Sequence, residues 1–136
     1  MASGIYTVFK EDLMTKTVNL GSGGDTIKVG LMNNSHSFSA ANAVWGDVSA
    51  NEASGTNYTA GGATLGTQTV TAGATTKWDA ADTSWATVTI TAYHAVLYDT
   101  TNTSSLICSF DFGGAKTATA GTFTIQWDAA GIITLA

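Results

Sequence analysis

Two histidines are the side chains in this sequence best suited to proton transfer or metal binding near neutral pH. His94 lies between Tyr93 and Ala95 in an apolar, strand-like stretch, where a histidine is typically a hydrogen-bonded part of the core or is partly exposed. His36 lies in a long polar stretch and has no carboxylate close to it in sequence. Neither residue belongs to a nucleophile elbow, an HExxH motif or a spaced cluster of Cys and His residues. The sequence therefore predicts no enzymatic activity, no metal site and no cofactor.

Aspartates are the other residues whose side chains could do chemistry, because two of them close together could bind calcium or act as an acid–base pair. Asp79 and Asp82 are close in sequence, and Asp99 and Asp111 form a looser pair. Calcium-binding loops carry alternating acidic residues and a glycine in a DxDxDG pattern, which this sequence lacks. Aspartates beside turn residues commonly accept hydrogen bonds from backbone amides. We therefore interpret these aspartates as caps of turns.

Four tryptophans raise the question of sugar binding, because exposed indole rings can stack on sugars. Trp85 and Trp127 belong to segments with the alternation of core strands, and Trp78 is expected to point inward. Trp45 is the exception, because it lies in the long polar stretch. It is the ring that we expect to be free for a ligand.

The composition excludes several classes of protein. The net charge is −5, only 11% of the residues are charged, and all five basic residues are lysines. Without arginine or a basic patch, nucleic acid is not expected as a partner. No segment approaches the roughly 18 apolar residues of a membrane span, and the first residues lack the pattern of a secretion signal. Cys108, the single cysteine, is expected to be a small buried hydrophobic residue. We expect a soluble, unsecreted protein whose weakly charged surface packs against copies of itself or a large assembly.

The segment 85–99, WATVTITAYHAVLYD, is the most strand-like part of the chain. In its first half Val88, Ile90 and Ala92 alternate with threonines, which predicts one buried and one exposed face. From Tyr93 to Tyr98 both faces are apolar, as in a strand covered on both sides. We predict that this segment is the central strand.

The remaining pattern predicts short strands around one helix. Apolar residues at a spacing of three to four predict an N-terminal helix over about residues 4–17, with Ser3 at its cap. Residues 32–57 form a long polar loop with a helical turn near 40–45, and a loop of that length is often functional. Strands are expected at 26–31, 58–65, 66–71, 106–112, 122–127 and 132–135, with 113–121 as a loop and Leu106, Cys108, Phe110 and Phe112 on one face. Gly61 and Gly62 indicate a bulge or the close approach of another backbone.

Regularly spaced short strands bounded by turn residues are typical of an all-β fold. We predict a single domain over residues 1–136. Its fold is an antiparallel β-sandwich or a jelly-roll-like barrel of seven to nine strands, with one short N-terminal helix.

Several segments of the chain, taken in order, resemble a family of small structural proteins of tailed bacteriophages. The most diagnostic are SGTNYTAGGATL, AVLYD with the following FDFG, and the ending FTIQWDAAGIITL, and the likeness covers nearly the whole chain. The family often carries a basic residue where this chain has His94, and the GSGG insertion before Asp25 is longer than usual. These segments are typical of a scaffold and contain no catalytic motif.

The resemblance implies a capsid decoration, or cement, protein that binds the outer surface of the phage head and stabilises the lattice of the major capsid protein. The implied state is a homotrimer in the virion, made in the host cytoplasm, with neither nucleic acid nor membrane as a partner. The alternative is a tail or head fibre component, or a virion module that binds glycans through Trp45. The candidate contact residues are Phe38, Val44, Trp45, Asn51, Glu52 and Tyr58.

Overall fold

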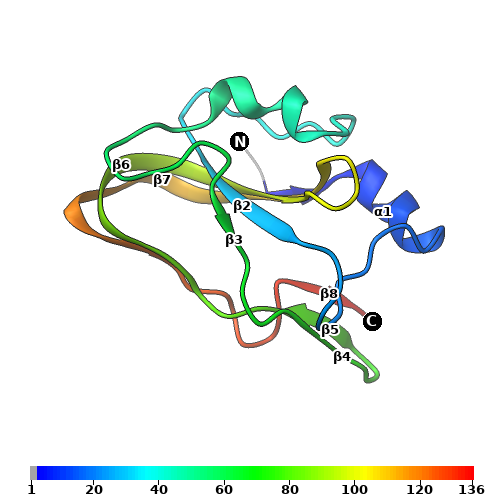
Figure 1. The fold of residues 1–136 in the computed structure, drawn as a ribbon. Coiled ribbons are helices and arrows are strands. Elements are labelled where there is room, and N and C mark those ends of the chain that lie inside the picture. The colour runs from blue at the N-terminus through cyan, green and yellow to red at the C-terminus, as the bar shows by residue number, and fades with distance from the viewer. Residues whose placement is uncertain (1–2) are drawn as a thin grey trace.

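Strand β6 (Thr83–Asp99) lies at the centre of the larger of two sheets. The structure is a computed structural model that describes residues 3–136. Over these residues, eight antiparallel strands and one α-helix confirm the predicted all-β, sandwich-like fold (Figure 1). The sheets have the strand orders β1-β7-β6-β2-β3 and β4-β5-β8. The other elements are β1 (Gly4–Ile5), α1 (Thr7–Met14), β2 (Ile27–Met32), β3 (Ala63–Thr64), β4 (Thr69–Thr71), β5 (Thr76–Asp79), β7 (Ser105–Ile125), β8 (Ile133–Leu135) and the 3-10 helices η1 (Trp45–Asp47) and η2 (Ser49–Asn51).

The end of β6 is buried on both faces, as predicted. Leu97 faces the interior between the two sheets, whereas Val96 and Tyr98 face the opposite side of the larger sheet. All three side chains are buried. β6 is therefore a strand with a core on each side, and its successive side chains enter one core or the other.

The hairpin of β6 and β7 is long and curved. The register shifts between Trp85 and Val88 and again between Val88 and Ile90, and Thr87 has a φ of 52°. Such bulges bend a strand and increase its twist. Figure 1 shows the result: β6 and β7 curve together, so that the first residues of β6 and the last residues of β7 reach the layer of the smaller sheet.

Two hydrophobic cores result from this arrangement. The first lies between the sheets and includes Trp78 and Trp85, which confirms their predicted burial, with Trp127 packed half-buried against it. The second lies on the other face of the larger sheet and consists of Tyr6, Met32, Val48, Val96, Tyr98 and Leu106. Cys108 belongs to the first core, and burial raises the pKa of its thiol.

Two predictions about β7 were wrong. Residues 113–121 continue the strand and form no loop, because they pair with β6 even though Gly113 and Gly114 have positive φ angles. A register shift between Leu97 and Tyr98 places Leu106 in the second core, so it does not share a face with Cys108.

The N-terminal helix is shorter than predicted. It begins at Thr7, because Gly4 and Ile5 instead pair with β7 as strand β1. Ser3 does not cap the helix; its hydroxyl oxygen accepts a hydrogen bond from the backbone amide of Asp111, at 2.8 Å. Phe9 anchors the helix on the first core.

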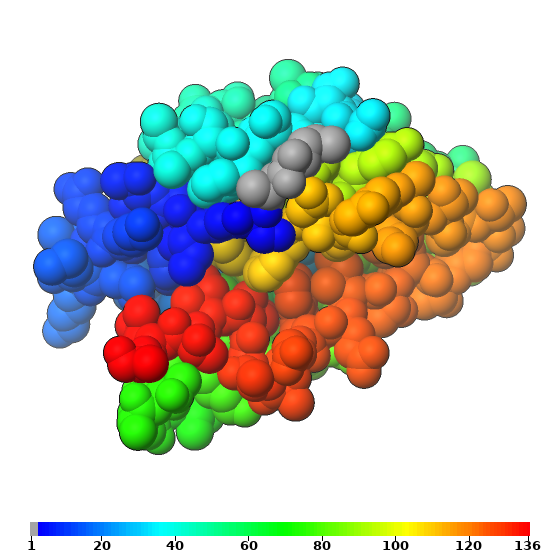
Figure 2. Space-filling view, turned by 180° about the vertical axis from the view of Figure 1, so that it is seen from behind, coloured from blue at the N-terminus to red at the C-terminus, as the bar shows by residue number. Residues whose placement is uncertain are grey.

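Residues 33–57, which we term the cap segment, cover the second core. Figure 2 shows this segment in cyan along the upper side of the molecule, over β7 in yellow to orange. Its helical turns are η1 and η2, slightly later than the predicted turn at 40–45. Isolated bridges join Val44 to Ser105 and Thr56 to Thr89. The predicted loop is therefore a fixed layer on the sheet.

Candidate functional site

Most of the predicted contact residues anchor the cap segment. The ring of Trp45 stacks on Tyr98, with ring centroids 4.3 Å apart, and covers Gly30, where a Cβ atom would collide with the indole. The ring of Phe38 packs against Tyr6 at 5.0 Å. One face of the half-buried Trp45 ring is therefore taken up in the packing of the protein itself, and the ring is less free for a glycan than the sequence predicts.

Glu52 and Tyr58 form a second internal anchor. The Tyr58 hydroxyl donates to Glu52 Oε1 at 2.8 Å and accepts from the Leu31 amide at 2.9 Å. Glu52 Oε1 also accepts from the Gly61 amide, at 2.7 Å. Asn51 is half-buried and its carbonyl accepts from the Asn33 amide at 2.9 Å. These groups tie the cap segment to β2 and to the turn before β3.

Val44 differs from the other contact candidates, because 37% of its surface is exposed. The other exposed residues of the cap segment are mainly serine, alanine, asparagine and glycine. Among residues 33–57, Asp47 is the only fully exposed charged residue. Backbone hydrogen bonds from Ala43 and Val44 lower the pKa of its carboxyl group. The outer surface of the cap segment is thus polar and almost uncharged.

The exposed face of the β6–β7 hairpin continues this uncharged surface. The backbones of Thr56 and Thr89 exchange two hydrogen bonds of 3.1 Å, which joins the cap segment to the hairpin. Thr91 and Thr117 share a hydroxyl hydrogen bond across the strands at 2.9 Å. Among the exposed positions of β6 and β7, Lys116 is the only charged residue.

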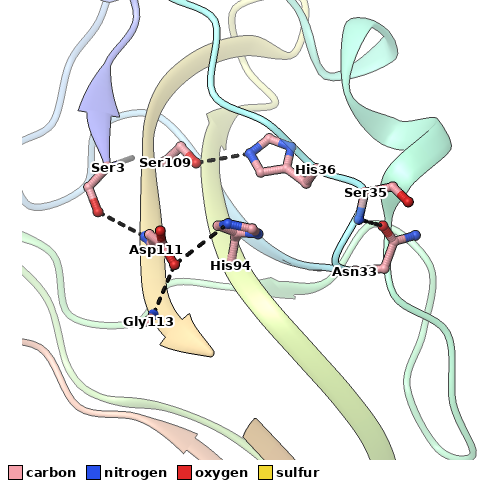
Figure 3. Close-up of polar contacts among 8 residues, drawn as sticks. All are labelled: Ser3, Asn33, Ser35, His36, His94, Ser109, Asp111 and Gly113. Carbon is pink, nitrogen blue, oxygen red and sulfur yellow. Dashed lines mark hydrogen bonds and ion pairs between the residues drawn. The ribbon is translucent and has the colours of Figure 1, made fainter. Parts of the chain in front are cut away.

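A polar cluster that the sequence did not predict lies beneath the cap segment. It joins His36 from the cap segment, His94 from β6, and Ser109 and Asp111 from β7 (Figure 3). Both histidines are 1% exposed, and their rings meet edge to face with centroids 5.0 Å apart. Residues separated by more than fifty positions thus meet in one buried site.

Hydrogen bonding in the cluster is incomplete. His36 Nε2 and Ser109 Oγ share a hydrogen bond of 3.0 Å. His94 Nε2 lies 3.6 Å from Asp111 Oδ1, and neither ring nitrogen of His94 has a hydrogen-bond partner among residues 3–136. Burial, and secondarily the neighbouring His94, lower the pKa of His36 to about 4. His36 is therefore held in its neutral form.

The cluster contains some of the residues of a nucleophilic site, but they are not arranged as such a site requires. His36 and Ser109 have the separation of a general base and its serine. The carboxylate that would orient the base faces His94 instead, because Asp111 pairs opposite His94 in the sheet. Grooves of about 330 and 290 Å³ are lined by Ser109 and Asp111 respectively, but neither histidine is among the residues that line them.

The predicted aspartate pairs separate in the structure. Asp79 accepts from the neighbouring Ala80 amide, as expected of a turn residue. Asp82 instead accepts from the amide of Trp127, 45 positions away, so its predicted role as the cap of a turn is wrong. Asp99 also caps a turn, at Thr101, but its pairing with Asp111 is wrong.

Asp99 instead faces the carboxyl group of Asp25 across the start of β2. Asp99 is 1% exposed, and its Oδ2 atom has no hydrogen-bond donor among residues 3–136. Burial and the neighbouring Asp25 raise the pKa of Asp99 to about 6. Two carboxylates in contact are stabilised when they share one proton.

No group of three or more His, Cys, Asp and Glu side chains among residues 3–136 is arranged to hold a metal ion. In the same range, no helix has the length and apolar character needed to cross a membrane.

Comparisons with protein-family models, with curated proteins and with solved structures found no match for this chain.

Proposed function

We propose that this protein is a capsid decoration protein of a tailed bacteriophage, which binds the outer surface of the head as a homotrimer and stabilises the lattice of the major capsid protein. The proposal starts from the resemblance of segments such as SGTNYTAGGATL and FTIQWDAAGIITL to phage structural proteins. It rests on one observation of the structure, the polar and almost uncharged surface of the cap segment and the β6–β7 hairpin, on which Asp47 and Lys116 are the exposed charges.

This surface suits a shallow protein contact. The cores of protein interfaces are depleted in charged residues, because an ion that is buried without a partner loses its hydration. Serine and threonine hydroxyls can donate and accept, so they adapt to the polar groups of a partner. Many copies on one lattice add their weak contacts, which removes the need for a deep binding site.

The packing of Trp45 favours this function over glycan binding. One face of its ring lies on Tyr98, and its edge fills the space above Gly30. Only the outer face of this half-buried ring is left for a sugar, because the other face and the edge belong to the packing over the second core. Titration of the intrinsic tryptophan fluorescence with glycans is therefore expected to give no saturable change.

Binding to phage heads that lack the protein tests the proposal. We expect the purified protein to bind expanded, DNA-filled heads and to raise the temperature at which they rupture. Light scattering should give the mass of a trimer. Binding without any change in the rupture temperature would contradict a stabilising role, and saturable binding of a glycan would favour the fibre or glycan-binding alternative.

Charge-introducing variants test the surface. Ala50→Lys and Ser54→Lys place a cation on exposed positions of the cap segment, and Thr71→Lys places one on the exposed strand β4 of the smaller sheet. We expect the first two to lose binding to heads and the matched control Thr71→Lys to keep it. If Thr71→Lys alone loses binding, the contact lies on the smaller sheet and the assignment of the surface is wrong.

A further inference from the structure

The buried histidine pair lies where the cap segment has few other attachments. His36 belongs to residues 34–39, and within the described chain no backbone hydrogen bond joins these six residues to a strand. Its own backbone hydrogen bonds are local: the His36 amide donates to Asn33 and the Asn42 amide donates to Ser39. Just beyond the stretch, the Thr7 amide donates to Ala40. The side chains of His36 and Phe38 therefore hold this stretch on the sheet.

The described residues around His36 offer no carboxylate that would compensate a charge on its ring. Its ring nitrogen shares a hydrogen bond with the hydroxyl of Ser109, which suits either a donor or an acceptor on the imidazole. The other titratable groups around it are Tyr6 beside Ser109, His94 at the edge of the ring, and Asp111 beyond His94. Among residues 3–136, the one contact between a histidine and a carboxylate is that of His94 with Asp111.

A proton therefore has different consequences at the two rings. A charge on His94 would lie 3.6 Å from the carboxylate of Asp111, which is its compensating partner. A charge on His36 would be buried beside a hydroxyl group and a second imidazole. An uncompensated buried charge is strongly unfavourable, and the short stretch that carries His36 can relieve it by moving into water.

We propose that His36 is an acid-sensitive latch: protonation of its imidazole on acidification releases residues 33–40 from the larger sheet, while the rest of the fold stays intact. The remainder of the cap segment is held by other contacts, the stacked ring of Trp45 and the hydrogen bonds of Glu52. Release would uncover Tyr6 and the ring of His94. The latch is independent of the proposed role on the phage head.

The pKa of His36 sets the size of the expected effect. In the closed state this pKa is about 4, and in the released stretch it returns to its ordinary value of 6.5. The equilibrium constant for opening then increases about 20-fold between pH 7 and pH 5 and about 100-fold between pH 7 and pH 4. The hydrogen-bonded amides of this stretch are those of Asn33, Ser35 and His36, and their hydrogen exchange, corrected for the intrinsic effect of pH, should accelerate by these factors.

The experiment uses the full chain and follows amide exchange and the histidine ring signals by NMR between pH 7 and pH 4. We expect the titration of His36 and the loss of protection in residues 33–40 to share one midpoint, while amides of β6 stay protected. His36→Gln keeps a partner for Ser109 but cannot be protonated, so its stretch should stay protected down to pH 4. His94→Gln, the matched control, removes the neighbouring imidazole that helps to lower the pKa of His36 in the closed state, so it should still open on acidification but by a smaller factor than the wild type.

Two results would overturn the latch. One is that the ring of His36 titrates in the wild-type protein while residues 33–40 keep their protection. The other is that His36→Gln opens over the same pH range as the wild type. The first measurement needs no variant, so the proposal can be refuted even if His36→Gln does not fold.

Discussion

Replacing Asp99 by asparagine should stabilise the protein at neutral pH. The carboxyl group of Asp99 is buried, accepts hydrogen bonds from the amides of Thr101 and Asn102 through Oδ1, and faces Asp25 with its other oxygen. Asparagine keeps the accepting oxygen for the turn. Its amide nitrogen then donates to Asp25, where the wild-type protein needs a proton.

The size and the pH range of the effect follow from the pKa of Asp99. This pKa rises from 3.8 in the unfolded chain to about 6 in the folded protein, so the folded state binds the proton more tightly. The stabilisation by that proton is complete below about pH 4 and is lost as the pH rises through 6. The loss amounts to up to about 3 kcal/mol at pH 7 and above. Asp99→Asn should avoid this loss, so its advantage over the wild type should grow from near zero at pH 4 to about that value at pH 7.

Urea unfolding followed by tryptophan fluorescence at pH 4, 5, 6 and 7 measures this difference. Comparing the variant with the wild type at each pH is essential, because His36 acts in the opposite direction. Its pKa falls from 6.5 to about 4 on folding, so its contribution to stability is lost as the pH falls through this range. The exposed Asp128, whose Oδ1 also accepts from a turn amide, provides the control Asp128→Asn, which should show no such growth. A variant Asp99→Asn that is less stable than the wild type at pH 7, or whose advantage does not change with pH, would refute the shared-proton interpretation.

Three further predictions concern packing and burial. Gly62→Ala should lower the free energy of unfolding in urea by at least about 2 kcal/mol, because φ is +80° there and a Cβ atom would collide with a β2 carbonyl oxygen. In the control Gly66→Ala the new Cβ atom meets no neighbour, so the free energy of unfolding should change by less than about 0.5 kcal/mol. Tyr58→Phe should cost about 1–3 kcal/mol in the same assay, because it removes the donor to Glu52 and the acceptor of a β2 amide; an unchanged midpoint would mean that water replaces the hydroxyl. Cys108 should resist a thiol reagent in the folded protein and react after unfolding in urea, because it is 2% exposed and burial raises its pKa; rapid labelling without urea would contradict its place in the core.

The central strand could be predicted because its signal is local. Residues 85–99 are rich in β-branched and aromatic side chains, and the change from alternating to continuous apolar character at Tyr93 marks where the cap segment begins to cover β6. Residues 113–121 have no such signal. Their glycines and small residues are typical of a turn, and they form a strand because β6 offers a partner along its whole length.

The histidine cluster could be predicted only in part. A turn at 100–104 pairs Asp99 with Ser105, and counting back from that pair places His94 opposite residue 110. The register shift at Leu97 moves the pairing by one position, so that His94 meets Asp111. Bulges of this kind arise from the packing of the whole sheet, and no local pattern around His94 indicates one. The position of His36 in the cluster depends on the path of the cap segment, and the sequence indicates that path even less than it indicates the bulge.

The same reasoning changes what an aromatic residue in a polar loop should be taken to mean. Phe38 and Trp45 stand out in the sequence as contacts for a partner, yet each ring lies on an aromatic residue of the protein itself. A long polar segment can lie flat on a sheet only if some side chains anchor it, and the large apolar ones supply the most buried area. Recognition by such a segment then falls to the small polar residues between the anchors. For this chain those are the serines, asparagines and threonines of an uncharged surface, so single alanine substitutions there should have small effects on binding and introduced charges large ones.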